Sequence, residues 1–98
     1  DLSYTLEEDE FNNLGYTYLQ GGNTKAALVL FKINVTEYPK SANAYDSYGE
    51  ALMNDGQKEA AIENYKKSLE LNHEKAITSI LGKVRQLLFR YKRIKNTI

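Results

Sequence analysis

The residues of this chain that could carry out chemistry are a single histidine and a short run of carboxylates. His73 is the only histidine and the chain contains no cysteine, whereas protein zinc sites combine three or four such ligands. The carboxylates from Glu7 to Glu10 are consecutive, at a predicted helix start where negative charge stabilises the helix dipole. A general acid and base would instead have to converge across a cleft. The residues therefore predict no catalytic site, no metal site and no cofactor.

Sequence motifs of the common enzyme classes are also missing. The chain has no G-x-S-x-G nucleophile elbow, no Walker loop and no H-E-x-x-H pair. Asn34-Val35-Thr36 has the form of a glycosylation sequon, but it falls in the middle of a predicted helix. We expect Asn34 to form a hydrogen bond near a helix crossing, because an unpaired buried amide costs about 1–3 kcal/mol. We predict that the chain is not an enzyme, which leaves binding as its function.

The composition is that of a soluble helical protein. Of the 98 residues, 42% are hydrophobic and 27% are charged. A membrane-spanning helix needs about 20 apolar residues, and the longest unbroken apolar run extends only from Ala26 to Phe31. Because secreted proteins need not contain disulfides, the absence of cysteine leaves the compartment open between cytoplasmic and periplasmic or secreted. The sequence starts at Asp1 with no apolar signal segment, and we expect it to be a piece of a longer protein.

The two ends of the chain carry opposite charge. Residues 1–20 contain five acidic and no basic side chains, and residues 75–98 contain seven basic and no acidic ones. A basic C-terminal helix stabilises its own dipole, and we prefer that interpretation. The alternative is a basic tail that binds a partner.

Two helices are predicted in the first 40 residues. Thr5 opens a capping-box pattern, so the first helix should begin near Leu6. Gly21-Gly22 ends this helix, and the second should cover about residues 24–37. Pro39 then stops the second helix. Residues 1–5 are expected to be a linker.

Three more helices are predicted in the remainder. Ser41 caps the third, and Asp55-Gly56 forms the turn to a fourth over roughly residues 57–71. A long amphipathic helix over 74–98 should fold over the open apolar end of the second helix pair as a cap, with Gly82 as a kink or a site of close approach. The residues expected to face inward in the first four helices are Phe11, Leu14, Gly15, Tyr18, Ala27, Leu28, Phe31, Val35, Ala44, Tyr45, Tyr48, Leu52, Ala61, Ile62, Tyr65 and Leu69.

The chain repeats itself after 34 residues. This shift places Gly49 on Gly15, Gly56 on Gly22, Ala61 on Ala27 and Tyr65 on Phe31. A fixed period of this length is typical of arrays in which each helix pair buries its apolar face against a neighbour. We therefore predict an all-α solenoid in a single domain, residues 1–98. Its parts are the linker 1–5, a first repeat 6–40, a second repeat 41–73 and a capping helix 74–98.

The repeated residues resemble the tetratricopeptide repeat, whose signature is W-x2-L-G-x2-Y, then A-x3-F, then P. The first unit has Phe11-x2-Leu14-Gly15-x2-Tyr18, Ala27-x3-Phe31 and Pro39. The second has Tyr45-x2-Tyr48-Gly49-x2-Leu52 and Ala61-x3-Tyr65, with His73 in place of the proline. The resemblance covers about residues 8–75 and implies a module for protein contacts. Without the proline, the fourth helix is expected to run a residue or two further.

A narrower resemblance concerns the amino-acid sequence of several segments, among them residues 31–35, 41–47 and 63–69. They are similar to the repeat tail of bacterial serine hydrolases of the penicillin-binding-protein-like or esterase-like kind. This would place a catalytic domain before Asp1 and give these residues an accessory role. The alternative to a binding module is therefore a structural or dimerising appendage of a larger bacterial hydrolase, with no separate ligand.

The tetratricopeptide resemblance implies that the first helix of each pair lines a concave groove for a peptide. The clamp that holds C-terminal carboxylates in chaperone-binding members needs bases there, and this face has none, so we expect neutral or basic ligands. The predicted groove residues are Asn12, Asn13, Tyr16, Leu19, Gln20, Asn43, Asp46, Ser47, Glu50, Met53 and Asn54.

The partners that we expect are a protein or peptide, the missing N-terminal domain or a second copy of the chain. Self-association would use Leu87, Ile94 and Ile98, because the last helix has more apolar surface than one hairpin can bury. Phe89 and Tyr91 lie among bases, as in some nucleic-acid sites, but they fall at core spacing. We therefore predict neither a nucleic-acid partner nor a membrane. The partner, the parent protein and the oligomeric state are left open.

Overall fold

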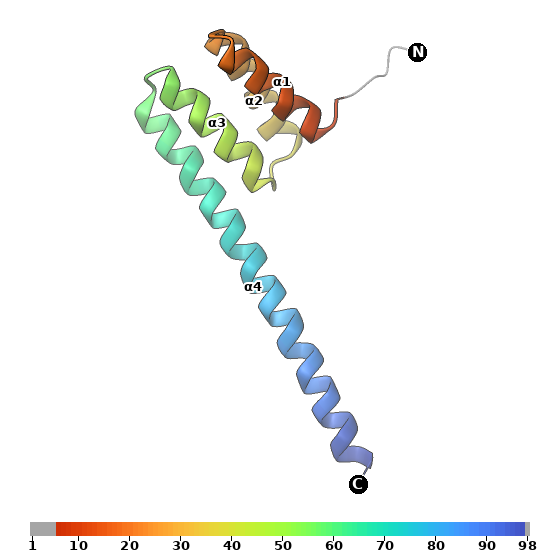
Figure 1. Cartoon of the computed structure of the whole chain (residues 1–98). Coiled ribbons are helices and arrows are strands. Elements are labelled where there is room, and N and C mark those ends of the chain that lie inside the picture. Colours follow the sequence, from red (N-terminus) through yellow and green to blue (C-terminus); the bar gives the residue numbers. More distant parts are fainter. Residues whose placement is uncertain (1–5, 98) are drawn as a thin grey trace.

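The computed structural model describes residues 6–97, and their side chains as far as Arg93. This part of the chain contains four helices, α1 (Glu8–Gln20), α2 (Thr24–Glu37), α3 (Ala42–Asn54) and α4 (Lys58–Thr97). Figure 1 shows α3 packed beside the first part of α4, with α1 and α2 on the other side of α3, and the remainder of α4 projecting away as an isolated rod. The described chain is all-α and measures 67 × 40 × 19 Å. The predicted solenoid of helix hairpins is confirmed.

Helices α1 and α2 form the first hairpin, and α3 with the first part of α4 forms the second. Each hairpin turns at a glycine in the left-handed region, Gly22 with a φ of 86° and Gly56 with a φ of 80°, which glycine adopts without a Cβ clash. Side chains cap the helices that follow. Asn23 accepts a hydrogen bond from the Ala26 amide, and Ser41 accepts one from the Ala44 amide. These caps match the predicted starts of α2 and α3.

The core of the first hairpin is built around Phe31. Its side chain is fully buried, and its ring lies against Gly15, where an added Cβ would collide with it. Tyr16 contacts the same ring edge to face, with 5.1 Å between the centroids. Ala27 and Ala51 are also fully buried in this cluster, so α3 closes the core. The glycine admits an aromatic ring from the neighbouring helix.

The second hairpin repeats this arrangement with less burial. A Cβ added at Gly49 would lie 2.8 Å from Cε1 of Tyr65, so the tyrosine fills the position that Phe31 fills in the first hairpin. Tyr65 itself is only half-buried. Ile62 is 47% exposed and Leu69 is 69% exposed, although both were predicted to face inward. Within the described residues no further repeat covers their apolar surface.

The start of α1 differs from the prediction. Thr5 lies outside the described residues, and the helix begins at Glu8 rather than near Leu6. Glu7 is the capping residue, and its amide donates a hydrogen bond to the Glu10 carboxylate at 3.2 Å. The carboxylates thus cap the helix as well as favouring its dipole. Leu14 and Tyr18, which were predicted to face inward, are 39% and 40% exposed.

The largest correction concerns the predicted break between the fourth helix and the capping helix. The structure has a single α4 of 40 residues with no turn near His73. In the first repeat Pro39 lacks an amide proton and cannot continue the helix, whereas His73 has one and the helix propagates. The predicted capping segment therefore does not fold back over the second hairpin. We call residues 76–97 the α4 extension.

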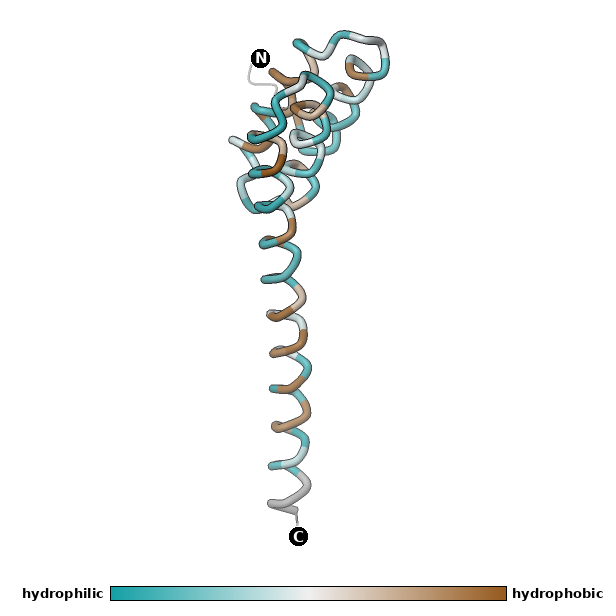
Figure 2. The backbone as a smooth tube through the Cα atoms, turned by 90° about the vertical axis from the view of Figure 1, so that its left-hand side faces the viewer, coloured by the Kyte–Doolittle hydropathy of each residue, from teal (hydrophilic) through white to brown (hydrophobic). Residues whose placement is uncertain are grey.

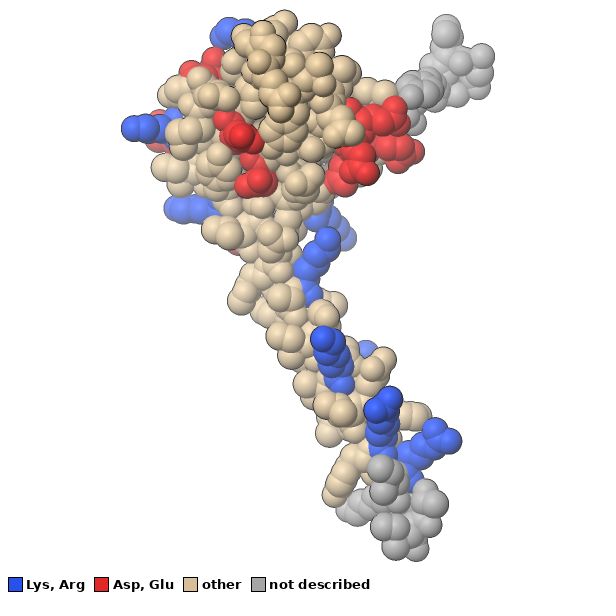
Figure 3. Space-filling view, in the orientation of Figure 1, with Lys and Arg blue, Asp and Glu red and all other residues tan. Residues whose placement is uncertain are grey.

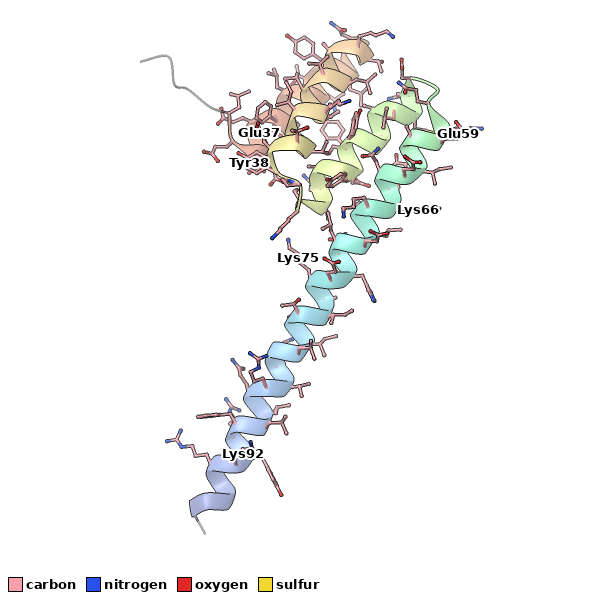
Figure 4. All side chains as sticks on the ribbon, turned by 180° about the vertical axis from the view of Figure 1, so that it is seen from behind. Glu37, Tyr38, Glu59, Lys66, Lys75 and Lys92 are labelled. Carbon is pink, nitrogen blue, oxygen red and sulfur yellow. The ribbon has the colours of Figure 1, made fainter. Side chains whose placement is uncertain are left out.

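Beyond its first turn, where Thr78 and Ser79 border a hollow with Lys40, the α4 extension has no neighbouring helix in the described part of the chain. Every described side chain from Asn72 to Arg93 is exposed, and Figure 4 shows its side chains projecting away from the rod on all sides. A Cβ added at Gly82 would meet no atom within 4 Å. Gly82 is thus not a site of close approach within this chain, and the helix passes through it without ending.

Candidate protein-binding face

The faces of α1 and α3 lie side by side, because two hydrogen bonds join them. The Ser47 hydroxyl donates to Oδ1 of Asn12 at 2.6 Å, and the Tyr16 hydroxyl donates to Oε2 of Glu50 at 2.6 Å. The partners are 35 and 34 residues apart, which is within one residue of the repeat period of 34. The first helices of the two hairpins therefore form one surface, as the groove prediction requires.

The predicted groove residues divide into two groups on this surface. Ser47 is buried, while Asn12, Tyr16 and Leu19 are half-buried and serve mainly to hold the repeats together. Ser47 is thereby removed from contact with a peptide. The exposed residues of the predicted set are Asn13, Gln20, Asn43, Asp46, Glu50, Met53 and Asn54. We call Asn13, Gln20, Glu50, Met53 and Asn54 the α1/α3 face.

The environment of Tyr16 is unfavourable to a phenolate. Partial burial, followed by its hydrogen bond to the Glu50 carboxylate, raises the pKa of Tyr16 to about 12. Burial also raises the pKa of Tyr65, and the charges of Asp46 and Glu50 raise it further. These two carboxylates make the exposed side of α3 negative.

The raised pKa of Tyr16 predicts a loss of stability in alkali. Because the neutral phenol is favoured in the folded state, its contribution is complete below pH 10 and is lost as the pH rises towards 12. In wild type we expect the free energy of unfolding, measured with urea, to fall over this interval. Tyr16→Phe should be less stable at pH 8 and should fall less steeply above pH 10. Tyr18→Phe, which removes an exposed hydroxyl from the same helix, is the control. Equal slopes in all three proteins would contradict the assignment.

Asn43 and Asp46 also line a second surface, which the other predicted groove residues do not reach. They border an open hollow of about 570 Å³ between α3 and α4, at the end of the array where a third repeat would follow. The Ser68 hydroxyl donates to the Ala42 carbonyl beneath it at 2.8 Å. Sequence reasoning missed this hollow, although the 34-residue shift could have located it. Its lining residues are Ala42, Asn43, Asp46, Tyr65, Ser68, Leu69 and Asn72.

The environment of Asn34 differs from the prediction that this side chain forms a hydrogen bond near a helix crossing. Its side chain is fully buried as predicted, but neither its Nδ2 nor its Oδ1 has a hydrogen-bond partner in the described part of the chain. The expected hydrogen bond is therefore not formed. The buried amide also could not act as a glycosylation acceptor in the folded chain.

The residues predicted for self-association lie on the α4 extension. Leu87 is 63% exposed, whereas Ile98 and the side chain of Ile94 lie outside the described residues. Phe89 and Tyr91 are 71% and 62% exposed, so the core position expected from their spacing was wrong for this chain. Figure 3 shows basic side chains along the extension and acidic ones gathered on the hairpins.

The described residues include neither a cluster of metal-binding side chains nor a membrane-spanning helix. No group of three or more histidine, aspartate or glutamate side chains within 6–97 could hold a metal ion. None of the four helices combines the length and apolar character that crossing a membrane requires.

Comparison with known proteins agrees with this geometry. The family model for the tetratricopeptide repeat matches residues 42–75, which form the second hairpin. Human Superkiller complex protein 3 is 31% identical over 88 residues, covering 82% of this chain and 6% of the relative. The crystal structure of MamA superposes with a TM-score of 0.65 and 29% identity, over 70% of this chain and 40% of that one. This chain thus spans a small part of the human protein and less than half of MamA.

The resemblance to hydrolase tails stays a prediction. The glycine and aromatic pairs, the left-handed turns and the period of 34 residues occur in both hairpins, and the family model matches the second of them. Residues 42–75 are thus a tetratricopeptide repeat by the family model, and the first hairpin repeats their glycine, aromatic ring and turn.

Proposed function

We propose that this chain is a protein-interaction module that binds a peptide, or an extended segment of a partner protein, along the α1/α3 face. The observation that carries the proposal is the hydrogen bond between Tyr16 and Glu50. It fixes two first helices side by side and leaves polar and apolar side chains exposed next to it. Asn13 and Gln20 can donate to and accept from a peptide backbone, and Met53 offers an adaptable apolar contact.

The charge of this face indicates the class of ligand. Its one charged residue is Glu50, with Asp46 nearby on the same helix and no base among the residues of the face. A ligand with lysine or arginine would gain charge attraction there, whereas an acidic ligand would be repelled. We therefore propose neutral or basic peptides as ligands. The name of one relative, Superkiller complex protein 3, denotes a complex, which is consistent with a scaffold role.

A peptide array gives a direct test. The labelled chain is incubated with an array of random dodecapeptides, and the best ligands are titrated by fluorescence anisotropy against variants of the face. Glu50→Gln keeps an acceptor for Tyr16 but removes the charge, and we expect the Kd of a basic ligand to rise roughly fivefold to tenfold. Met53→Ala should also weaken binding.

Two substitutions on α2 serve as matched controls. Glu37→Gln removes an exposed carboxylate and Val29→Ala shortens an exposed apolar side chain, and neither residue belongs to the α1/α3 face. Neither should alter the Kd. Selection of mainly acidic peptides, or equal weakening by the control variants, would contradict the proposal. If no peptide binds, the chain acts as a structural appendage without a separate ligand, which is the alternative function.

A further inference from the structure

The open hollow between α3 and α4 is the counterpart of a surface that is covered in the first hairpin. Its residues Asp46, Tyr65 and Ser68 lie 34 positions after Asn12, Phe31 and Asn34. In the first hairpin α3 covers these positions. Asn12 accepts the hydrogen bond from Ser47 of α3, and Phe31 and Asn34 are fully buried. Because equivalent positions of the first hairpin are covered by a helix, the hollow has the position at which another helix would pack.

The exposed fractions of equivalent side chains in the two hairpins support the view that the hollow is an uncovered repeat surface. Leu28 is half-buried, whereas Ile62, its counterpart one period later, is 47% exposed. Val35 is half-buried, whereas its counterpart Leu69 is 69% exposed. The same positions of the repeat thus lose their cover in the second hairpin. The missing helix must run antiparallel to α4, as α3 runs relative to α2.

The α4 extension also exposes apolar side chains, on the same side of α4 as the uncovered residues of the second hairpin. At about 100° per residue, Ile62 and Leu69 share one stripe of α4 with Ile80, Leu87 and Tyr91, all within about 40° of one another. In the extension these residues are 59%, 63% and 62% exposed, in that order. Figure 2 shows apolar residues recurring along the isolated rod. One apolar stripe therefore runs the length of α4, over both the hairpin and the extension.

We infer that a second copy of this chain supplies the missing helix, and that two copies exchange their α4 extensions in an antiparallel, two-fold symmetric dimer. With the two-fold axis between Glu74 and Lys75, Leu69 of one copy lies opposite Ile80 of the other, and Ile62 lies opposite Leu87. Each extension then occupies the hollow of the other copy, in the orientation that a third repeat would require. This dimer leaves Asn13, Gln20 and Met53 free and does not depend on the proposed peptide binding.

Charge selects this arrangement over a pairing of two extensions with each other. The extension contains six bases and no acid, whereas residues 58–75 contain four of each. A parallel pair would place two basic segments side by side, but the antiparallel pair places each against a neutral one. Glu74 of each copy then lies beside Lys75 of the other.

The side of the extension that would face α3 of the other copy is also complementary. Lys83 follows Tyr65 by 18 residues, or five turns, so both lie on the same edge of α4. Tyr65 is the residue that contacts α3, through Gly49. In a two-fold pair this edge brings Lys83 towards α3 of the second copy, whose Asp46 is exposed.

The first test uses two matched aspartate variants of the extension. Leu87→Asp falls on the stripe and Phe89→Asp on the opposite face, and both side chains are more than half exposed in the single chain. We expect sedimentation velocity to show a dimer for wild type and for Phe89→Asp, and a dimer at least about 30-fold weaker for Leu87→Asp. A wild-type monomer at high micromolar concentration, or equal weakening by both variants, would overturn the inference.

The second test fixes the register with cysteines, which the natural chain lacks. Chains with Leu69→Cys and chains with Ile80→Cys, distinguished by mass, are mixed and oxidised. A disulfide between the two kinds of chain is expected. Leu69→Cys should not pair with itself, because its two copies would lie about 16 Å apart along the helices and a disulfide needs Cα atoms within about 7 Å. Disulfides between two Ile80→Cys chains would indicate a parallel coil and would overturn the antiparallel dimer.

Discussion

Replacing Phe31 with alanine is expected to lower the free energy of unfolding by about 3–5 kcal/mol. The ring is fully buried, rests on Gly15 and contacts the edge of Tyr16. Its removal leaves a cavity, because Gly15, Ala27 and Ala51 beside the ring are too small to fill the space. A domain of this size has a total stability of only about 5–15 kcal/mol, so a large part would be lost. Urea denaturation followed by circular dichroism measures the change.

Val29 on the same helix provides the control for Phe31. Its side chain is 59% exposed, so Val29→Ala removes little buried surface and should change the stability by less than about 0.5 kcal/mol. A loss below about 1 kcal/mol for Phe31→Ala would mean that Phe31 is not the centre of the core.

The second large effect is expected at the glycines that receive the aromatic rings. Gly15→Ala places a methyl group against the fully buried Phe31 ring, and we expect a loss of about 1–3 kcal/mol. This loss outweighs the gain of about 1 kcal/mol that alanine normally brings to a helix interior. Gly49→Ala should lose less, because Tyr65 is half-buried and its ring can turn towards the hollow. Thermal and urea denaturation measure both.

Gly82→Ala provides a contrast of opposite sign. An added methyl group at Gly82 meets no atom within 4 Å, and it lies on the side of α4 away from the stripe. The helix content should therefore rise with no loss of stability. The order of stability expected is Gly82→Ala, then Gly49→Ala, then Gly15→Ala. If Gly15→Ala were as stable as Gly82→Ala, the close packing of Phe31 on α1 would be refuted.

Much of the fold could be predicted because its signals are local. The bounds of α2 were predicted to the residue, since Asn23 and Pro39 mark its ends. The glycine and aromatic pairs were found by the 34-residue shift alone. The missing break near His73 could not be predicted, because a residue that permits a helix to continue does not show whether it does. Folding back of the predicted capping helix, residues 74–98, depended on whether burial against the same chain would outweigh the free-energy cost of a turn. The helix continues to Thr97 instead.

For the candidate binding face, the 34-residue repeat predicted which helices are neighbours but not which side chains contact each other. The period correctly indicated that α1 and α3 would be neighbours, but not that Asn12 and Ser47 would bond to each other. That pairing depends on the distance between two helices, which no spacing in the sequence reports. The burial of Asn34 was predicted and its missing partner was not, because a hydrogen bond requires a second group whose position is set by packing.

The way in which the helices contact one another also sets how fast the chain can fold. Among the described residues, α1 and α2 make no contact with α4, and the side-chain hydrogen bonds between the hairpins span no more than 35 residues. No contact has to wait for a long loop to close, and such local topologies fold within microseconds to milliseconds. Either hairpin can therefore form first and serve as the template on which the other condenses.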